Sequence, residues 1–215
     1  MTPRLIAEQE RALSTYLDEL ERWNRRINLT AVPRGAAWTR HVSESLELLE
    51  VAAPPFSSTA VDVGSGNGAL GVVLGVARPD IEVVLIESDS RKAAFLEHLA
   101  GLLGLSNVAV APMRAEVAGT LEGMRQHFDL AMARAVAPSP VLCELALPLV
   151  RVGGRMCAIV TAAGAAAREC AAASRLCGGG IPQRQTAGVL RIDKERDTPD
   201  IYPRRPGVPA RRPLL

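Results

Sequence analysis

An acidic residue and a dense run of glycines stand together in the stretch AVDVGSGNGALG, residues 60 to 71. Asp62 lies in a short apolar run, and four glycines follow it within eight positions: Gly64, Gly66, Gly68 and Gly71. Glycines at this density allow a tight turn and let a ligand approach the backbone closely. The stretch therefore predicts a loop that binds a small-molecule cofactor.

Two classes of cofactor are compatible with this loop. Counted from Gly66, the glycines match the Gly-x-Gly-x-x-Gly pattern of dinucleotide-binding loops. Counted from Gly64, the first glycine after the apolar run, the glycines are preceded by Asp62. The carboxylate of Asp62 would attract the cationic methionine end of S-adenosylmethionine and would repel a pyrophosphate. Glu87, nineteen residues after Gly68, ends the next apolar run and would bind the ribose hydroxyls of either cofactor. The early acid favours S-adenosylmethionine over NAD.

Strands alternate with helices on both sides of the loop. Apolar runs predict strands at 59–63, 81–87, 107–113, 128–134, 154–160 and 186–193, and the segments between them predict helices that include 90–104, 139–150 and 162–176. This alternation is typical of a parallel sheet covered on both faces by helices. Such sheets bind ligands beyond the carboxyl ends of their strands, where the glycine loop is expected.

The two ends of the chain differ from this α/β region. Amphipathic spacing predicts helices at 4–23 and 39–51, and APPFSS, residues 53–58, has the composition of a linker. The segment from Arg196 has five prolines in twenty residues and is predicted to be extended. We therefore expect an N-terminal helical extension over 1–55, a central domain over 56–195, and a basic proline-rich tail over 196–215, packed on or near that domain.

Positive charge is concentrated at the same two ends. The chain has a net charge of only +2, yet residues 22–40 contain five arginines and no acid. Residues 194–215 contain six basic and three acidic residues. Patches of this kind suit a polyanion such as nucleic acid, although an arginine-rich solvated surface has the same composition.

Composition excludes several other classes of protein. The four cysteines form no C-x-x-C pair and have no histidines at zinc spacing, so buried thiols in a reducing cytosol are expected and no metal site. No apolar run reaches the roughly 18 residues of a membrane span. Charged residues at Glu8, Glu10 and Arg11 do not fit a secretory signal peptide. We expect a cytoplasmic, monomeric protein without a membrane partner.

With these elements placed, the chain resembles the small-subunit ribosomal RNA guanine-N7 methyltransferases, the RsmG (GidB) family. The resemblance runs almost from end to end and rests on RWNRRINLTAV (22–32), RHVSESL (40–46), DVGSGNGALG (62–71), ESDSRKAAFL (87–96), MRAE (113–116), ARAVAP (133–138) and YPRRPGVPARRPL (202–214). It implies an α/β, Rossmann-like class I S-adenosylmethionine-dependent methyltransferase fold with a short N-terminal helical extension. It also implies N7-methylation of guanine 527 in 16S ribosomal RNA, on the RNA or the 30S subunit.

The resemblance assigns roles to individual residues. The donor would contact Gly64 and Ala69 in the loop, beside Asp62, Gly66 and Gly68, which the loop pattern itself marks as donor-binding. Its ribose would lie near Glu87, Ser88 and Asp89, and its adenine near Ala115 and Glu116. Arg134 would lie in the active site and serve both catalysis and donor binding. Phosphate contacts are expected from the basic side chains Arg25, Arg26, Lys92, Arg114, Arg204 and Arg205.

Two segments depart from the family pattern, and two other functions stay open. Ala69-Leu70 replaces a bulky residue and proline, and VTAAGAAA, residues 160–167, lacks the lysine usual after the fifth strand. The same fold would also serve an NAD-dependent oxidoreductase, and the missing lysine would suit a non-catalytic RNA-binding assembly factor. Guanine N7 carries a lone pair and no proton, so its methylation needs no general base. This agrees with a chain that has three scattered histidines and no catalytic triad.

Overall fold

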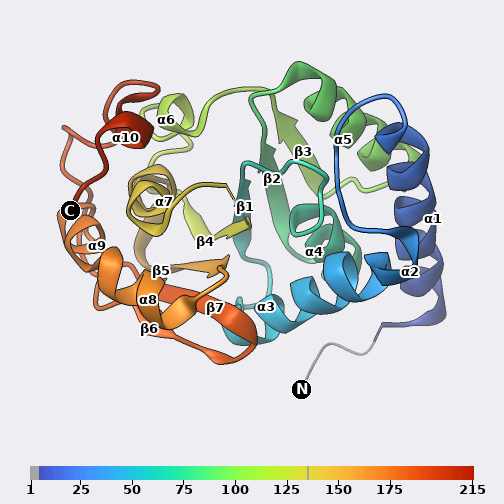
Figure 1. Ribbon diagram of the computed structural model, residues 1–215, viewed down its shortest axis with the longest axis horizontal. Helices are drawn as coiled ribbons and strands as arrows, with labels where there is room; N and C mark the ends of the chain where they lie inside the picture. The colour runs from blue at the N-terminus through green and yellow to red at the C-terminus, as the bar shows by residue number, and fades with distance from the viewer. Residues whose placement is uncertain (1–4, 135) are drawn as a thin grey trace.

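The computed structural model describes residues 5–134 and 136–215, and its centre is one seven-stranded sheet (Figure 1). Ala135, in the ARAVAP segment, lies outside the described residues. The strands are β1 (Thr59–Val63), β2 (Glu82–Ile86), β3 (Val108–Ala111), β4 (Phe128–Arg134), β5 (Val150–Ile159), β6 (Gln183–Arg184) and β7 (Val189–Asp193). Their spatial order is β3-β2-β1-β4-β5-β7-β6. Strands β1 to β5 pair in parallel, and β7 is antiparallel to both β5 and β6.

Most strands form where the apolar runs predict them. The strands at 59–63 and 128–134 have the predicted bounds. The segment 186–193 begins with a 3₁₀ turn, Thr186–Gly188, before β7 starts at Val189. Strand β6 was not predicted, because two residues are too short to show an alternating pattern.

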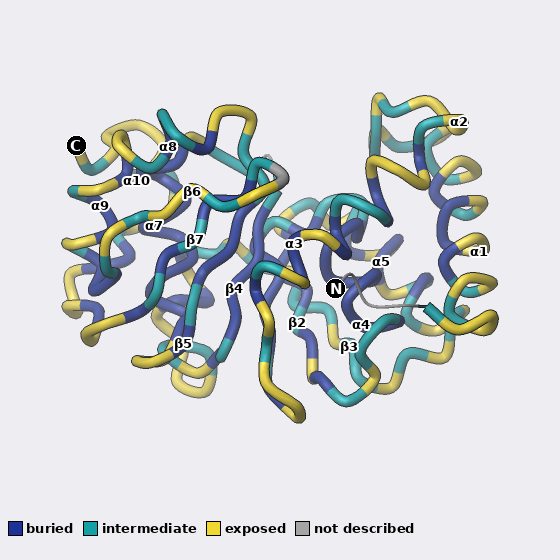
Figure 2. The backbone as a smooth tube through the Cα atoms, turned by 90° about the horizontal axis from the view of Figure 1, so that it is seen from below, coloured by how far each residue is buried: buried dark blue, intermediate teal, exposed yellow. Residues whose placement is uncertain are grey.

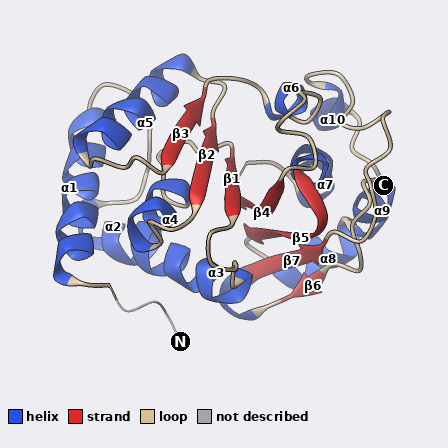
Figure 3. Ribbon diagram, turned by 180° about the vertical axis from the view of Figure 1, so that it is seen from behind, coloured by secondary structure: helices blue, strands red, loops and turns tan. Residues whose placement is uncertain are grey.

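Helices cover both faces of the sheet (Figure 3). One face carries α1 (Ala7–Asn24), α3 (Glu44–Ala52), α4 (Gly71–Ala77) and α5 (Ser90–Leu102), and the other carries α6 (Ala115–Ala118), α7 (Ser139–Ala146), α8 (Ala163–Glu169) and α9 (Ala171–Leu176). Alternate strand residues face the two layers: Leu130 and Met132 pack in the first core, and Ala131 and Ala133 in the second. The central strands β1 and β4 are accordingly buried along most of their length, whereas β3 is half-buried and β6 is exposed (Figure 2). Among the described helices, none is long and apolar enough to cross a membrane.

The N-terminal extension packs into the same core as the sheet. Leu13 and Leu17 of α1 belong to one buried cluster with Leu74 of α4 and Phe95 of α5. The helix predicted at 39–51 is part of a longer helical segment that starts at Arg34 and is not regular throughout. The α-helix α2 (Arg34–Ala37) continues through π-helical turns (Trp38–Ser43) into α3. Short π-helical segments are rare and often lie at functional sites. Here the π-helical turns lie beside the glycine loop.

The expectation of an extended tail is wrong over four residues. Val208–Arg211 form a short helix, α10, whose second residue is Pro209. Proline has a backbone angle suited to a first helical turn and lacks an amide hydrogen that such a turn leaves unpaired. The tail is held against the domain, since the guanidinium of Arg125 donates to the carbonyls of Thr198 and Tyr202 at 2.7 and 2.8 Å. Helix α10 lies beside α6, at the opposite end of the molecule from α1 (Figure 1).

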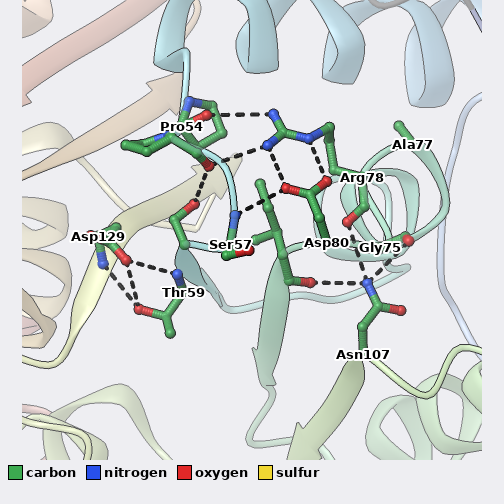
Figure 4. Close-up of polar contacts among 12 residues, drawn as sticks. Pro54, Ser57, Thr59, Gly75, Ala77, Arg78, Asp80, Asn107 and Asp129 are labelled. Atoms are coloured by element: carbon green, nitrogen blue, oxygen red, sulfur yellow. Dashed lines mark hydrogen bonds and ion pairs between the residues drawn. The ribbon is translucent and has the colours of Figure 1, made fainter.

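Polar side chains brace the amino ends of the strands (Figure 4). Asn107 donates to the carbonyls of Gly75, Arg78 and Ile81 at 2.9 to 3.4 Å. Arg78 pairs with Asp80 at 2.7 Å through both Nε and Nη2. Further contacts at this edge join Asp129 to the backbone amide and hydroxyl of Thr59. These contacts tie the connections between strands to one another.

Candidate active site

A cavity of about 600 Å³ opens at the carboxyl ends of β1, β2 and β4. We call it the loop cavity. The strand order reverses between β1 and β4, which is the place where open α/β sheets bind ligands. Eleven of the residues predicted from the sequence line it: Asp62, Gly64, Gly66, Ala69, Glu87, Ser88, Lys92, Arg114, Ala115, Glu116 and Arg134. Segments as far apart in the sequence as Asp62 and Arg134 therefore meet at this cavity.

Six predicted residues are not among those that line the cavity. A Cβ atom at Gly68 would lie 2.8 Å from the side chain of Val72, beneath the loop. Asp89 caps α5 by accepting a hydrogen bond from the amide of Arg91 at 2.9 Å. The remaining four are arginines at the ends of the chain, of which three are exposed and one is half-buried: Arg25, Arg26, Arg205 and Arg204.

The glycine loop is held open by two acids. Gly64 and Gly66 have φ angles of +68° and +54°, which side chains other than glycine rarely adopt. The carboxylate of Glu87 accepts hydrogen bonds from the amides of Gly66 at 2.9 Å and Asp89 at 2.8 Å. Asp62 accepts one from the amide of Gly71 at 2.9 Å. Both acids that the sequence marks as ligand-binding groups therefore also shape the loop.

Asp62 differs electrostatically from an ordinary aspartate. Its side chain is only 2% exposed, and this burial raises its pKa to about 7. The hydrogen bond from Gly71 acts in the opposite direction and the nearby negative charge of Glu87 in the same direction as burial, and the pKa of about 7 is the net result. A cation placed near this carboxyl group would favour its ionised form. Asp62 is therefore suited to respond to a positively charged ligand.

The N-terminal extension forms one wall of the loop cavity. Thr30 and His41 line it, and their side chains are 3.2 Å apart, from Oγ1 to Nε2. Buried Ser45 donates to the carbonyl of Ala69 at 2.8 Å, which ties α3 to the glycine loop. Sequence reasoning assigned no role to Thr30 or Ser45, although both lie in the two N-terminal motifs that carry the family resemblance.

Two buried polar atoms near the loop cavity stay without a hydrogen-bond partner among the described residues: Tyr16 Oη and His41 Nδ1. Burial, with smaller contributions from the positive charges of Arg134 and Arg40, lowers the pKa of His41 to about 4. Burial also raises the pKa of Tyr16, whose hydroxyl is close enough to Arg134 and Asp62 to sense their charges. At neutral pH both rings are thus uncharged.

Arg134 stands at the end of β4, where an ion pair holds it. Its Nη2 donates to Glu44 Oε2 at 2.9 Å, and its Nη1 donates to the carbonyl of Arg40. Burial lowers the pKa of Arg134, the carboxylate of Glu44 raises it, and the charge of Arg40 lowers it again. Glu44 also pairs with the guanidinium of Arg40. The extension therefore positions the arginine that the sequence places in the active site.

Glu116 has protein partners at the position predicted to bind adenine. Its carboxylate is 3% exposed and pairs with Arg114 Nη2 at 2.7 Å. It also accepts hydrogen bonds from Arg114 Nε at 3.2 Å and from the amide of Gly207 in the tail at 2.9 Å. A carboxylate has about four acceptor positions, so about one remains for a further donor. The tail thereby contributes to the wall of the loop cavity, which Ala210 also lines.

Arg204 has a similar internal partner. Its backbone amide, Nε and Nη2 all donate to Glu144, at 2.9, 2.8 and 2.5 Å. Glu144 is fully buried, so this bidentate pair compensates a charge that water cannot reach. Arg204 is thereby placed as an anchor of the tail, whereas the neighbouring Arg205 is exposed.

A second cavity, of about 740 Å³, adjoins the first. We call it the outer cavity. The two cavities share Arg40, Arg134 and Ala137. Beyond this boundary the outer cavity is lined by α3, by the end of β5 and by the VTAAGAAA segment, in which Thr161, Ala162, Ala165 and Ala166 have small side chains. The segment without the expected lysine therefore forms the wall of a space next to Arg134.

The reversed strand order, the antiparallel β7 beside β5, and a glycine loop between acids on β1 and after β2 define a class I S-adenosylmethionine-dependent methyltransferase fold. Solved structures agree: the fold is similar to an S-adenosylmethionine-dependent O-methyltransferase from Thermotoga maritima (TM-score 0.60, 14% identity, covering 86% of this chain and 73% of the other). It is also similar to a protein from Corynebacterium glutamicum (TM-score 0.57, 18% identity, 85% and 91%).

Sequence comparison gives the particular family. The family model described as rRNA small subunit methyltransferase G matches residues 9–183. Proteins named ribosomal RNA small subunit methyltransferase G from Roseiflexus castenholzii and Moorella thermoacetica are 40% and 38% identical, covering 99% and 98% of this chain and 94% and 92% of theirs. The chain belongs to this family of RNA methyltransferases, as its motifs predicted.

Proposed function

We propose that this protein transfers the methyl group of S-adenosylmethionine to N7 of guanine 527 in 16S ribosomal RNA. S-adenosylmethionine is the cofactor of this methyltransferase fold. The observation that supports the proposal most is the boundary at Arg134, where the loop cavity and a second cavity meet. A methyl transfer needs two substrates that meet end to end, one in each space.

The loop cavity fits this donor in shape. A Cβ atom at Gly66 would meet nothing closer than the carbonyl oxygen of Gly64 at 3.7 Å, so the glycine leaves free space above the loop. His41 Nδ1, which has no hydrogen-bond partner in the described part of the chain, supplies a buried polar atom beside that space. We infer that the glycine loop and Ala69 hold the methionine part of the donor, with Asp62 facing its cationic end.

The other predicted residues would hold the rest of the donor. Glu87 and Ser88 follow β2, where their side chains would receive ribose hydroxyls, and Asp89 supports them through its hydrogen bond to Glu87. Ala115 and Glu116 would face the adenine. When bound, the donor supplies a methyl group on a sulfonium, which is the electrophile of the reaction. The chain's own part is to position this methyl carbon against the nucleophile.

The side chains around the boundary suit a nucleophile that has no proton to lose. His41 has a pKa of about 4, so it is a weak base at neutral pH. Glu87 accepts two backbone hydrogen bonds, and Glu44 serves two arginines. Guanine N7 needs no base, because its lone pair is free. Arg134, in contact with the base, would orient it, and positioning alone contributes about 7–11 kcal/mol in favourable cases.

The exposed basic residues would bind the RNA backbone. Arg25 and Arg26 follow α1, and Arg205 lies on the tail, so both ends of the chain would contact phosphates. Lys92 and Arg114 line the loop cavity and would approach the target nucleotide or its neighbours. In this arrangement residues 1–55 and 196–215 serve as the RNA-binding parts and residues 56–195 as the catalytic domain.

The proposal is tested by mapping N7-methylguanine in 16S ribosomal RNA from cells with and without the gene. The expected result is one modified guanine, at position 527, that disappears without the gene and returns when purified protein and S-adenosylmethionine act on the unmodified 30S subunit or its RNA. If the protein binds donor and RNA but transfers no methyl group, it is a non-catalytic assembly factor instead. Binding of NAD in place of S-adenosylmethionine would favour the oxidoreductase.

A further inference from the structure

The outer cavity has a charge distribution that is unusual for an RNA-binding protein. Its lining contains three carboxylates, Glu44, Glu47 and Glu169, and only two guanidiniums, Arg40 and Arg134. A space with this balance repels phosphate, so it is unsuited to the RNA backbone. Carboxylates accept hydrogen bonds and do not donate them. The occupant that fits such a wall is therefore a group that presents hydrogen-bond donors.

The three carboxylates are not equivalent. Glu44 is engaged by Arg134 at 2.9 Å and by Arg40. Glu47, one turn further along α3, and Glu169, at the end of α8, are exposed and make no hydrogen bond or ion pair with the other residues that the structure describes. Two acceptor groups in the cavity lining, one on α3 and one on α8, are thus available to a ligand.

The boundary at Arg134 orients a guanine in this space. Methyl transfer requires N7 to face the loop cavity, and the carbonyl oxygen O6 lies on the same edge of the base, within reach of a donor such as Arg134. The adjacent Watson–Crick edge shares O6 and carries two neighbouring donors, N1–H and N2–H, on the side of the base away from N7. With N7 at the boundary, these donors point away from it into the rest of the outer cavity, whose lining includes Glu47 and Glu169.

We propose that the outer cavity is the target-base site and that Glu47 and Glu169 recognise the Watson–Crick edge of the flipped guanine. The inference rests on the proposed function and specifies its substrate recognition. A carboxylate matches the paired donors N1–H and N2–H of guanine, whereas adenine and uracil present only one donor on that edge beside acceptors. The small side chains Ala162, Ala165 and Ala166 leave the cavity wide enough for a base to enter.

The same carboxylates assist the chemistry. The N7 lone pair forms the new bond to the methyl carbon while the carbon–sulfur bond breaks, and its electron pair stays on sulfur. The sulfonium charge is lost and an equal positive charge appears on the methylated guanine, with no proton released. N1–H becomes more acidic as that charge develops, so a carboxylate that accepts it stabilises the transition state more than the ground state.

The test compares guanine with inosine, which lacks only the N2 amino group. RNA oligonucleotides that carry the target stem-loop with either base are methylated under single-turnover conditions by the wild-type protein, by Glu47→Gln, by Glu169→Gln and by the double variant. Glu97→Gln, an exposed glutamate on α5, is the matched control. The double variant is expected to lose about 10- to 100-fold in kcat/KM on guanine. The double variant should lose much less of its kcat/KM on inosine. Inosine has C2–H in place of the N2 amino group, so the amide group of the introduced glutamine does not face a second hydrogen-bond donor.

The possible outcomes are distinguishable. Loss of the wild-type preference for guanine over inosine in the double variant, with donor affinity and melting temperature unchanged, supports the site. An unchanged preference overturns it, even if overall activity falls. If the wild-type protein methylates neither RNA nor 30S subunits at guanine N7, the proposed function itself is wrong. Where the double variant supports the site, the single variants show whether the contact comes from Glu47 on α3 or from Glu169 on α8.

Discussion

Two aspartates at opposite edges of the sheet show how differently the two edges are built. At the amino edge, the hydrogen bonds that Asp80 accepts from Arg78 lower the pKa of Asp80 to about 2, so it stays ionised within a local ion pair (Figure 4). At the carboxyl edge, burial raises the pKa of Asp62 to about 7. Asp62 accepts a hydrogen bond from the backbone amide of Gly71 but forms no ion pair with the described residues.

The same contrast extends to the neighbouring polar groups. Around Asp80, Asn107 satisfies three carbonyl groups, and Thr59 and Asp129 satisfy each other. Around Asp62, two buried polar atoms lack partners among the residues that the structure describes, and the loop has left-handed backbone angles. Unsatisfied buried polar groups lower stability, and they collect where a ligand can use them. The amino edge therefore stabilises the fold, and the carboxyl edge is organised for binding.

The largest effect is expected at Gly66. Gly66→Val would place a branched side chain in the free space above the loop, at a φ angle of +54°. Donor affinity should fall at least about 100-fold, because the donor and the side chain compete for the same volume. Calorimetry with S-adenosylmethionine measures the loss.

Gly104→Val is the matched control for this experiment. Gly104 has a similar φ of +63° and open space around its Cβ position, but it lies after α5, away from the loop cavity. The Gly104→Val variant should lose about as much stability as Gly66→Val and should keep the donor affinity of the wild type. Equal donor affinities for the two folded variants would refute the role of the loop.

The amino edge should respond in the opposite way. Asn107→Ala removes the donor that three carbonyls share, and we expect a loss of about 1–3 kcal/mol in the free energy of unfolding. Donor affinity of the folded variant should not change. Denaturant titration and calorimetry measure the two quantities, with the exposed Asn28→Ala as a control near zero. A stable variant with weakened donor binding would contradict the division between the edges.

A smaller effect is expected from the ionisation of Asp62. Because its pKa in the folded protein is about 7, donor affinity should rise about tenfold from pH 6 to pH 8, as the carboxylate that faces the cationic donor forms. The effect on stability has the opposite sign: a raised aspartate pKa stabilises the fold at low pH, and this contribution is lost as the pH rises from about 4 through 7. Asp62→Asn should flatten both profiles. An unchanged pH dependence of affinity in this variant would assign the titration to another group.

The smallest effect concerns the tail. Arg205→Ala should reduce the salt dependence of RNA binding by about 0.7 to 0.9 units of slope, the value for one phosphate contact. Donor affinity should stay the same, and Arg205→Lys should restore the slope because it keeps the charge. Titration of RNA at several salt concentrations measures this. If the slope of Arg205→Ala equals that of the wild type, the phosphate contact does not exist.

Local patterns predicted most of the fold. Apolar runs located β1 and β4 with their observed bounds, since a buried strand is a continuous apolar run of the right length. They missed β6 and α10, which are two and four residues long, because such short elements form only where a neighbour pairs with or packs against them. The family itself was recognisable from motifs at both ends of the chain, and the comparisons confirm it.

The candidate site divides along the same line. The sequence by itself determined the glycine loop, the two acids that flank it and Arg134, because each is marked by its position at a strand end. Only the tertiary structure decided their partners: Glu44 for Arg134, Glu144 for Arg204, and Arg114 with Gly207 for Glu116. Most of these pairs span 60 to 91 positions, so no local pattern encodes them. Packing of the extension and the tail against the sheet brings their charges together, and this packing decides which arginines pair within the protein and which stay exposed.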